Sequence, residues 1–203
     1  MATISRKSLS KIEHLYYDEH LSAQEIALKL DVSMDAVYYF MRHNKIKRRD
    51  KNEANRLRFQ KALPSFKLRN ISNAYLEKLR IIGTMLYWGE GSKWDGEVIV
   101  DFANSDKDMI LLFLKFLREV CGVDEKKLRV FPYFYANQDA DENIRYWSGI
   151  TKIKKEQFTK PYIKKDSRKE KINKMKHGLV HVRYADKKLL MLIRNWIEEY
   201  KKY

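Results

Sequence analysis

The chain has 203 residues, of which 44% are hydrophobic, enough for one medium-sized domain or for a small domain and a larger one. Its net charge of +15 predicts a polyanionic partner, and nucleic acid is favoured over a membrane surface because no strongly cationic amphipathic helix stands out. A single cysteine excludes an internal disulfide, and neither a membrane-spanning run nor a signal peptide is visible. We therefore expect a cytoplasmic protein, associated with the nucleoid if the cell is prokaryotic.

Residues 8–43 show the pattern of three short helices. Ser22 and Glu25, three residues apart, form a capping box at the start of the second helix. Asp31 fits the turn before the third helix, because aspartate tolerates the left-handed backbone that glycine otherwise supplies. The small residue Ala27 sits where the two helices would cross. This spacing predicts a helix-turn-helix, and the segment resembles the DNA-binding domains of resolvases and sigma factors.

We assign residues 1–49 to this domain and expect its third helix to enter a DNA groove. Many helical hairpins share the spacing without touching DNA, but the basic segment after the third helix favours DNA contact. The residues expected to contact DNA here are Ser33, Met34, Asp35, Tyr38, Tyr39, Arg42, His43, Lys45, Lys47, Arg48 and Arg49.

A polar and strongly basic segment follows this domain. Between Lys45 and Arg69 there are ten basic residues and only two acidic ones. We interpret residues 50–71 as a basic linker that contains a short helix and runs along the phosphate backbone. A solvated linker without a partner is the alternative. A second basic block spans residues 152–176.

Residues 72–203 form the second predicted domain, which begins with a helix capped by Ser72. This helix is apolar from Ile81 onward and ends in the sequence Gly-Glu-Gly at residues 89–91. An acidic side chain at a helix C-terminus is unfavourable in the field of the helix dipole, so its presence there indicates a functional role. A carboxylate beside unpaired carbonyl groups is the donor set that hard cations such as Mg²⁺ prefer.

The same residues resemble the motif of the LAGLIDADG homing endonucleases, in which a helix ends in a small residue, an acidic residue and a glycine. The resemblance implies that Glu90 binds a catalytic Mg²⁺ ion, and we include Gly89 in the same metal site. Hydrolysis of a phosphodiester also needs a cation near the developing negative charge, and we expect Lys93, just past the motif, to supply it. An ordinary surface lysine is the alternative for Lys93.

In that family the motif helix packs against a twin, and a complete cleavage site uses two motifs. Only one motif is present here, so the resemblance implies a homodimer. Its interface would involve Gly83, Leu86 and Gly89. Two residues depart from the family, because Met85 replaces a second small residue and Trp88 is bulky for a tightly packed helix pair.

Alternating and helical apolar patterns in the rest of the chain predict an α+β fold. Strands are expected at 97–103, 128–136 and 179–184, and helices at 107–120, 141–149 and after Asp186. Asp101 is expected to face solvent, with a role beside the metal as the alternative. The LAGLIDADG resemblance implies an α/β domain with a curved antiparallel sheet that straddles the major groove. The residues of this sheet expected to contact DNA are Arg129, Tyr133, Tyr135, His181 and Arg183.

These patterns leave two main hypotheses for the function. The first is a divalent-metal-dependent homing endonuclease that hydrolyses double-stranded DNA at a specific site. The second is a transcription regulator that uses the LAGLIDADG-like domain as a DNA-binding and dimerising scaffold without cleavage, as in sporulation regulators that join these two modules in the opposite order. An RNA-binding factor is a third class, because charge does not distinguish RNA from DNA. No P-loop, dinucleotide-binding loop or zinc-ligand spacing occurs, so no small-molecule substrate is expected.

Overall fold

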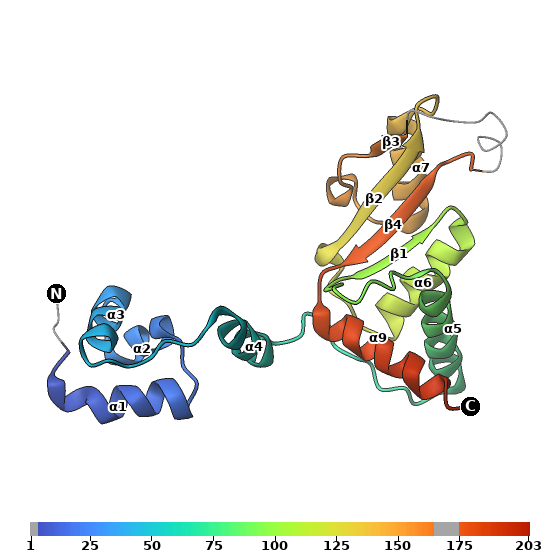
Figure 1. Cartoon of the computed structure of the whole chain (residues 1–203). Helices are drawn as coiled ribbons and strands as arrows, with labels where there is room; N and C mark the ends of the chain where they lie inside the picture. Colours follow the sequence, from blue (N-terminus) through green and yellow to red (C-terminus); the bar gives the residue numbers. More distant parts are fainter. Residues whose placement is uncertain (1–3, 165–174) are drawn as a thin grey trace. The chain divides into compact units, whose positions relative to one another are not determined.

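The computed structural model describes residues 4–164 and 175–203 (Figure 1). The chain divides into two compact units, residues 1–63 (unit 1) and residues 64–203 (unit 2). The described residues form eight α-helices and one mixed four-stranded sheet, which confirms the α+β class. None of the described helices combines the length and the apolar character that a membrane span requires. Residues 165–174 of the second basic block lie outside the described residues.

Unit 1 consists of short helices around its own apolar core. Its main elements are α1 (Leu9–Glu13), the π-helical turn η2 (His14–Asp18), α2 (Ala23–Leu30), α3 (Met34–His43) and α4 (Lys51–Lys61). The buried core includes Ile12, Leu15, Ile26, Val37, Phe40, Met41 and Ile46. Helix α4 occupies the first half of the segment that we interpreted as a linker.

The corner between α2 and α3 has the local structure expected from the sequence. Ser22 Oγ accepts a hydrogen bond from the Glu25 backbone N–H at 3.2 Å, and the Glu25 carboxylate accepts one from the Ser22 N–H at 2.6 Å. Asp31 adopts the left-handed conformation, with φ 52° and ψ 49°. Ser33 then caps α3 by accepting from the Ala36 N–H at 3.1 Å. These contacts fix the direction in which α3 leaves the turn.

Unit 2 contains the sheet, in the strand order β1-β4-β2-β3. The strands are β1 (Val100–Asn104), β2 (Leu128–Tyr135), β3 (Tyr162–Lys164) and β4 (Leu179–Tyr184). Strand β4 pairs antiparallel with β1 and β2, whereas β3 pairs parallel with β2 because the chain crosses over through α7 (Ala140–Thr151). The sheet is also not strongly curled. The expected antiparallel pairing therefore holds for β1, β4 and β2, but the additional strand β3 makes the sheet mixed, and the expected strong curvature is absent.

Four helices cover one side of this sheet (Figure 1). They are α5 (Ala74–Glu90), α6 (Lys107–Glu119), α7 and α9 (Lys187–Tyr200). The core between helices and sheet includes Val100, Phe102, Phe113, Phe116, Trp147, Val182 and Trp196. In Figure 1 none of the described helices crosses the opposite side of the sheet. Alternate residues of the strands are therefore left on an outer face.

Helix α5 begins one residue later than expected and packs closely against α6. Asn73, rather than Ser72, caps it by accepting a hydrogen bond from the Leu76 N–H at 2.8 Å. Gly83 lies at the contact with α6, where a Cβ atom would collide with the buried ring of Phe116. The glycine is therefore needed for packing within unit 2.

We expect Gly83→Ala to lower the free energy of unfolding of unit 2 by about 1–3 kcal/mol, because a methyl group would have to displace the Phe116 ring. Gly89→Ala on the same helix is the matched control. A Cβ there meets nothing within 4 Å, so this change should be neutral or stabilising by up to about 1 kcal/mol. All four tryptophans lie in unit 2, so their fluorescence during urea unfolding reports on this unit. Equal effects of the two substitutions would contradict this packing.

Ser65 fixes the start of unit 2 to its last helix. Its backbone N–H and its hydroxyl both donate to Asp186 Oδ2 at 2.7 Å. The Tyr184 hydroxyl donates in turn to the Ser65 carbonyl at 2.5 Å. Asp186 also caps α9 by accepting from the N–H groups of Lys188 and Leu189. The end of the segment that we interpreted as a linker is thus anchored in unit 2.

This anchor has a consequence for stability at acidic pH. Burial acts to raise the pKa of Asp186, but hydrogen bonds from Ser65 and from the first turn of α9 outweigh burial and lower the pKa below its ordinary value. A carboxyl group with a lowered pKa in the folded state contributes stability above its unfolded pKa, about 3.9. That contribution is lost as the pH falls through the folded pKa.

We expect Ser65→Ala to destabilise unit 2 by about 0.5–1.5 kcal/mol at neutral pH, because the hydroxyl bond to Asp186 is lost. The difference from the wild type should shrink as the pH falls below about 4, where Asp186 becomes protonated in the unfolded chain. Urea unfolding followed by tryptophan fluorescence over a series of pH values measures both effects. A difference that does not depend on pH would contradict the role given to Asp186.

Candidate nucleic-acid interfaces

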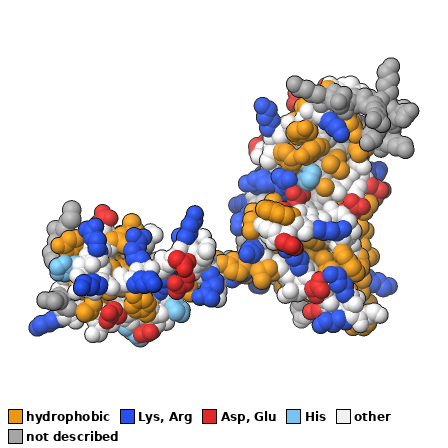
Figure 2. Space-filling view, viewed as in Figure 1, with side chains coloured by type: hydrophobic (Ala, Val, Ile, Leu, Met, Phe, Trp, Pro, Cys, Tyr) orange, Lys and Arg blue, Asp and Glu red, His pale blue; other side chains and the backbone are white. Residues whose placement is uncertain are grey.

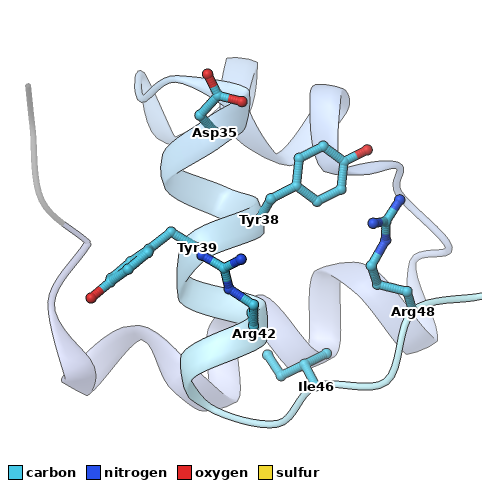
Figure 3. A pocket seen from close by; sticks show the side chains of 6 residues that line it. All are labelled: Asp35, Tyr38, Tyr39, Arg42, Ile46 and Arg48. Atoms are coloured by element: carbon cyan, nitrogen blue, oxygen red, sulfur yellow. The ribbon is translucent and has the colours of Figure 1, made fainter.

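The outer side of α3 carries aromatic and basic side chains, while its apolar side faces the core of unit 1. Tyr39 is 63% exposed, and Arg42 beside it is also exposed (Figure 3). The ring of Tyr39 stacks on His43 with the ring centres 6.1 Å apart, and the Arg42 guanidinium lies 5.9 Å from the centre of the Tyr39 ring. Met34 and Asp35 are exposed in the first turn. The side of α3 expected to face DNA is therefore accessible.

The basic segment after α3 is held against unit 1 through its backbone. Ile46 is buried, and its N–H donates to the Met41 carbonyl at 2.9 Å. The Tyr17 hydroxyl donates to the Lys47 carbonyl at 3.0 Å. These anchors position the segment while leaving its cations in solvent. The exposed cations are Lys45, Lys47 and Arg48.

Arg49 differs from these neighbours, because its side chain is only 8% exposed. Its guanidinium lies 4.0 Å from the centre of the Tyr16 ring and donates to the Leu21 carbonyl at 3.0 Å. Its backbone N–H donates to the Tyr16 hydroxyl at 2.8 Å. Arg49 therefore joins the segment to the core of unit 1, which does not suit the phosphate contact that we expected of it.

A surface cleft of about 650 Å³ opens between α3 and the segment that follows it (Figure 3). Within it, the Arg48 guanidinium lies 4.6 Å from the centre of the Tyr38 ring. The sequence did not indicate this cleft, because it depends on Ile46 folding the chain back toward α3. Its wall offers both hydrogen-bond donors and acceptors. The lining residues are Asp35, Tyr38, Tyr39, Arg42, Ile46 and Arg48.

Strand pairing assembles a second group of aromatic and basic side chains on the outer face of the sheet. Across β1, β4 and β2, the register aligns Asp101, Arg183 and Arg129 in one row. His181 and Phe131 lie opposite each other in the next row. Figure 2 shows hydrophobic side chains bordered by basic ones over β2 and β4. These residues belong to strands that are far apart in the sequence.

Aromatic rings lie close together on the part of this outer face formed by β2 and β3. The ring centres of Phe131 and Tyr133 are 5.3 Å apart, and those of Tyr133 and Tyr162 are 4.7 Å apart. His181 lies 5.3 Å from Tyr133, and the Arg183 guanidinium lies 4.6 Å from the centre of the Phe131 ring. Tyr162 is 51% exposed and was not among the residues that we expected to contact DNA. Its location follows from the parallel pairing of β3, which the sequence did not indicate.

Asp101 organises the basic end of this face. Its Oδ1 atom lies 2.7 Å from His181 Nδ1, and its Oδ2 accepts from Arg183 Nε at 2.8 Å. Asp101 is only 8% exposed, so the expectation that it faces solvent was wrong. Tyr135, which we expected to contact DNA, is only 9% exposed at the other end of β2. It therefore offers little surface to a ligand.

The acidic motif ends α5 at the molecular surface. Glu90 is the last residue of the helix and is exposed. Gly91 has an extended backbone rather than a left-handed one, and a Cβ there would collide with the Tyr87 carbonyl oxygen. Lys93 Nζ donates to the Gly89 carbonyl at 3.3 Å. The lysine therefore compensates part of the negative end of the helix dipole.

One chain alone supplies an incomplete set of metal ligands at this position. Within residues 4–164 and 175–203, no group of three or more His, Cys, Asp or Glu residues could hold a metal ion. Glu90 contributes one carboxylate, and the Gly89 carbonyl is already bonded to Lys93. A hard cation would fit here chemically only if a second molecule completed the donor set.

The exposed side of α5 differs from the interface that we expected. Gly83 packs against Phe116 of the same chain, which does not suit the dimer contact that we expected of it. Leu86 is partly buried against the core of unit 2, and its place in a dimer interface stays a prediction. Gly89 is exposed. The large apolar residues exposed on α5 are Ile81 (38%), Ile82 (41%) and Trp88 (39%), together with Tyr75.

Comparisons with protein-family models, with characterised proteins and with solved structures find no match to this chain. The functional assignment therefore depends on the geometry of α3, of the outer sheet face and of the end of α5.

Proposed function

We propose that this protein binds double-stranded DNA sequence-specifically, with α3 as the helix that enters the major groove. The observation that supports this most directly is the exposed outer side of α3, with Tyr39, Arg42 and His43 on it, above a buried apolar side. An α-helix fits the major groove of B-DNA, where its side chains reach the base edges. The Ser22 capping box and Asp31 hold the helix at a fixed angle to α2.

The side chains of this surface match the chemistry of DNA. Arg42 can donate two hydrogen bonds to a guanine, and Asp35 can accept one from the amino group of a cytosine. Met34 can contact a thymine methyl group. Lys45 and Lys47, which are exposed on an anchored backbone, suit contacts with phosphates. Such contacts fix the register of the protein and make its affinity depend on salt.

Selection of bound sequences from a random duplex library tests this proposal, and we expect one sequence to be enriched. Arg42→Ala should then weaken binding to the selected duplex by about 1–3 kcal/mol and relax specificity at one base pair. Lys47→Ala should weaken binding to all duplexes equally. It should also reduce the salt dependence of the affinity by the amount that about one phosphate contact contributes. Lys202→Ala, at an exposed position near the C-terminus, is the charge-matched control. No enrichment, or equal losses for all three variants, would contradict the proposal.

For unit 2 we propose the activity implied by its LAGLIDADG-like motif, which is cleavage of DNA by a homodimer with one Glu90 from each protomer. The exposed carboxylate of Glu90 and the exposed apolar side chains of α5 support this proposal, because a second copy packed on α5 would add a second carboxylate. When bound there, Mg²⁺ would supply Lewis-acid activation of the phosphate. Lys93 would hold a positive charge close to the same group.

A non-cleaving transcription regulator is the second candidate. It is favoured by the size of Met85 and Trp88, because large side chains at a helix contact hold the two helix axes further apart. The two Glu90 carboxylates would then be too distant to share metal ions. Unit 2 would in that case serve only as a DNA-binding and dimerising scaffold.

Incubation of the selected duplex with Mg²⁺ separates the two candidates. If the dimer is a nuclease, the wild type cuts the duplex, and Glu90→Gln binds it with unchanged affinity but cuts at least about 100-fold more slowly. Glu156→Gln, which removes one exposed carboxylate from the turn before β3, should cut like the wild type. Binding without cutting by all three proteins would exclude the nuclease and leave the regulator.

A further inference from the structure

The outer face of the sheet has a chemistry that duplex recognition does not explain. Reading base edges in a groove requires hydrogen-bonding side chains at the centre of the contact. Here the rings of Phe131, Tyr133 and Tyr162 occupy the part of the face formed by β2 and β3. The polar groups of Asp101 and Arg183 are bonded to each other. Because the bases of a duplex are already stacked on one another, these rings would meet only base edges.

The rings are held side by side by the register of the sheet. Tyr133 lies opposite Tyr162, so the two phenol rings keep their separation as long as β2 and β3 stay paired. Their planes are tilted by 39°, whereas Phe131 meets Tyr133 edge to face at 77°. Tyr162 is half exposed, and so its ring is open to a ligand. A fixed row of this kind can accept a flat ring by stacking at little cost in side-chain entropy.

The charges around the rings complement a phosphate backbone. Arg129 is exposed on this face at the start of β2, and Lys164 is exposed at its other end, opposite Tyr135. Among the strand residues that the structure describes on this face, Asp101 is the sole carboxylate. It is paired with Arg183, so it does not repel a polyanion strongly. The aromatic row therefore lies between cations at both ends.

We propose that this face binds single-stranded DNA by stacking unpaired bases on Tyr133, Tyr162 and Phe131, with phosphates held by Arg129 and Lys164. This inference rests on the proposed function in one respect, which is that DNA is the partner. In it α3 binds the duplex, and the sheet face binds an unpaired stretch. Stacking tolerates any sequence, because every base has a π face. In this account α3 determines which DNA sequence is bound, and the sheet face determines that the second bound stretch is single-stranded.

Fluorescence anisotropy with the full chain tests the proposal, using a labelled single-stranded oligodeoxynucleotide of mixed sequence at fixed salt. We expect the double substitution Tyr133→Ala and Tyr162→Ala to weaken single-strand binding by about tenfold or more. The matched double substitution to Phe keeps both rings and should bind like the wild type. Tyr162→Ala alone, at a half-exposed edge position, gives a smaller loss in the same direction and guards against misfolding of the double variant. Tryptophan fluorescence verifies that unit 2 is folded in each variant.

The outcomes for the two surfaces are separable. Arg42→Ala should weaken binding of the selected duplex much more than binding of the single strand. A failure of the helix-turn-helix proposal can therefore be told apart from a failure of this one. The stacking proposal would be overturned if the Ala and Phe variants bound the single strand equally well. It would also be overturned if the same oligonucleotide made of RNA bound much more tightly than DNA, because the ligand would then not be DNA.

Discussion

Burial in two separate hydrophobic cores determines which side chains of this chain remain in solvent. In unit 1, burial of Val37, Phe40 and Met41 against α2 turns the opposite side of α3 outward. In unit 2, four helices cover a single face of the sheet, and the alternation of the strands leaves the other residues outside. Each proposed DNA-binding surface is thus made of the side chains that burial of the neighbouring core leaves in solvent. A change that repacks either core would move the corresponding surface with it.

The two surfaces differ in chemistry, and this difference suggests that they bind different forms of DNA. The surface around α3 offers charged donors and acceptors on a helix, which suit base edges in a major groove. The sheet surface offers rings in a fixed row between Arg129 and Lys164, which suit the faces of unpaired bases. The net charge of +15 serves both surfaces, because it attracts DNA of either kind. The carboxylate of Glu90 lies at the exposed end of α5.

Much of the local structure was predictable because it depends on neighbours along the chain. The capping box at Ser22, the left-handed turn at Asp31 and the strand at 179–184 are of this kind. The remaining features depend on distant partners. Asp101 is covered by residues 80 and 82 positions later, and the helical pattern around Gly83 does not indicate which neighbouring helix will contact it. For the same reason the sequence suggested Arg129, Tyr133, His181 and Arg183 separately but not the aromatic row that unites Tyr133 with Tyr162.

The most direct test of the claim that α3 reads duplex DNA is amide hydrogen exchange of the full chain with and without its selected duplex. We expect slower exchange on binding across residues 33–49, because the backbone of α3 and of the basic segment would lie against DNA. The buried helix α6 should exchange at the same rate in both states. Protection confined to unit 2, with residues 33–49 unchanged, would contradict the assignment of α3 as the recognition helix.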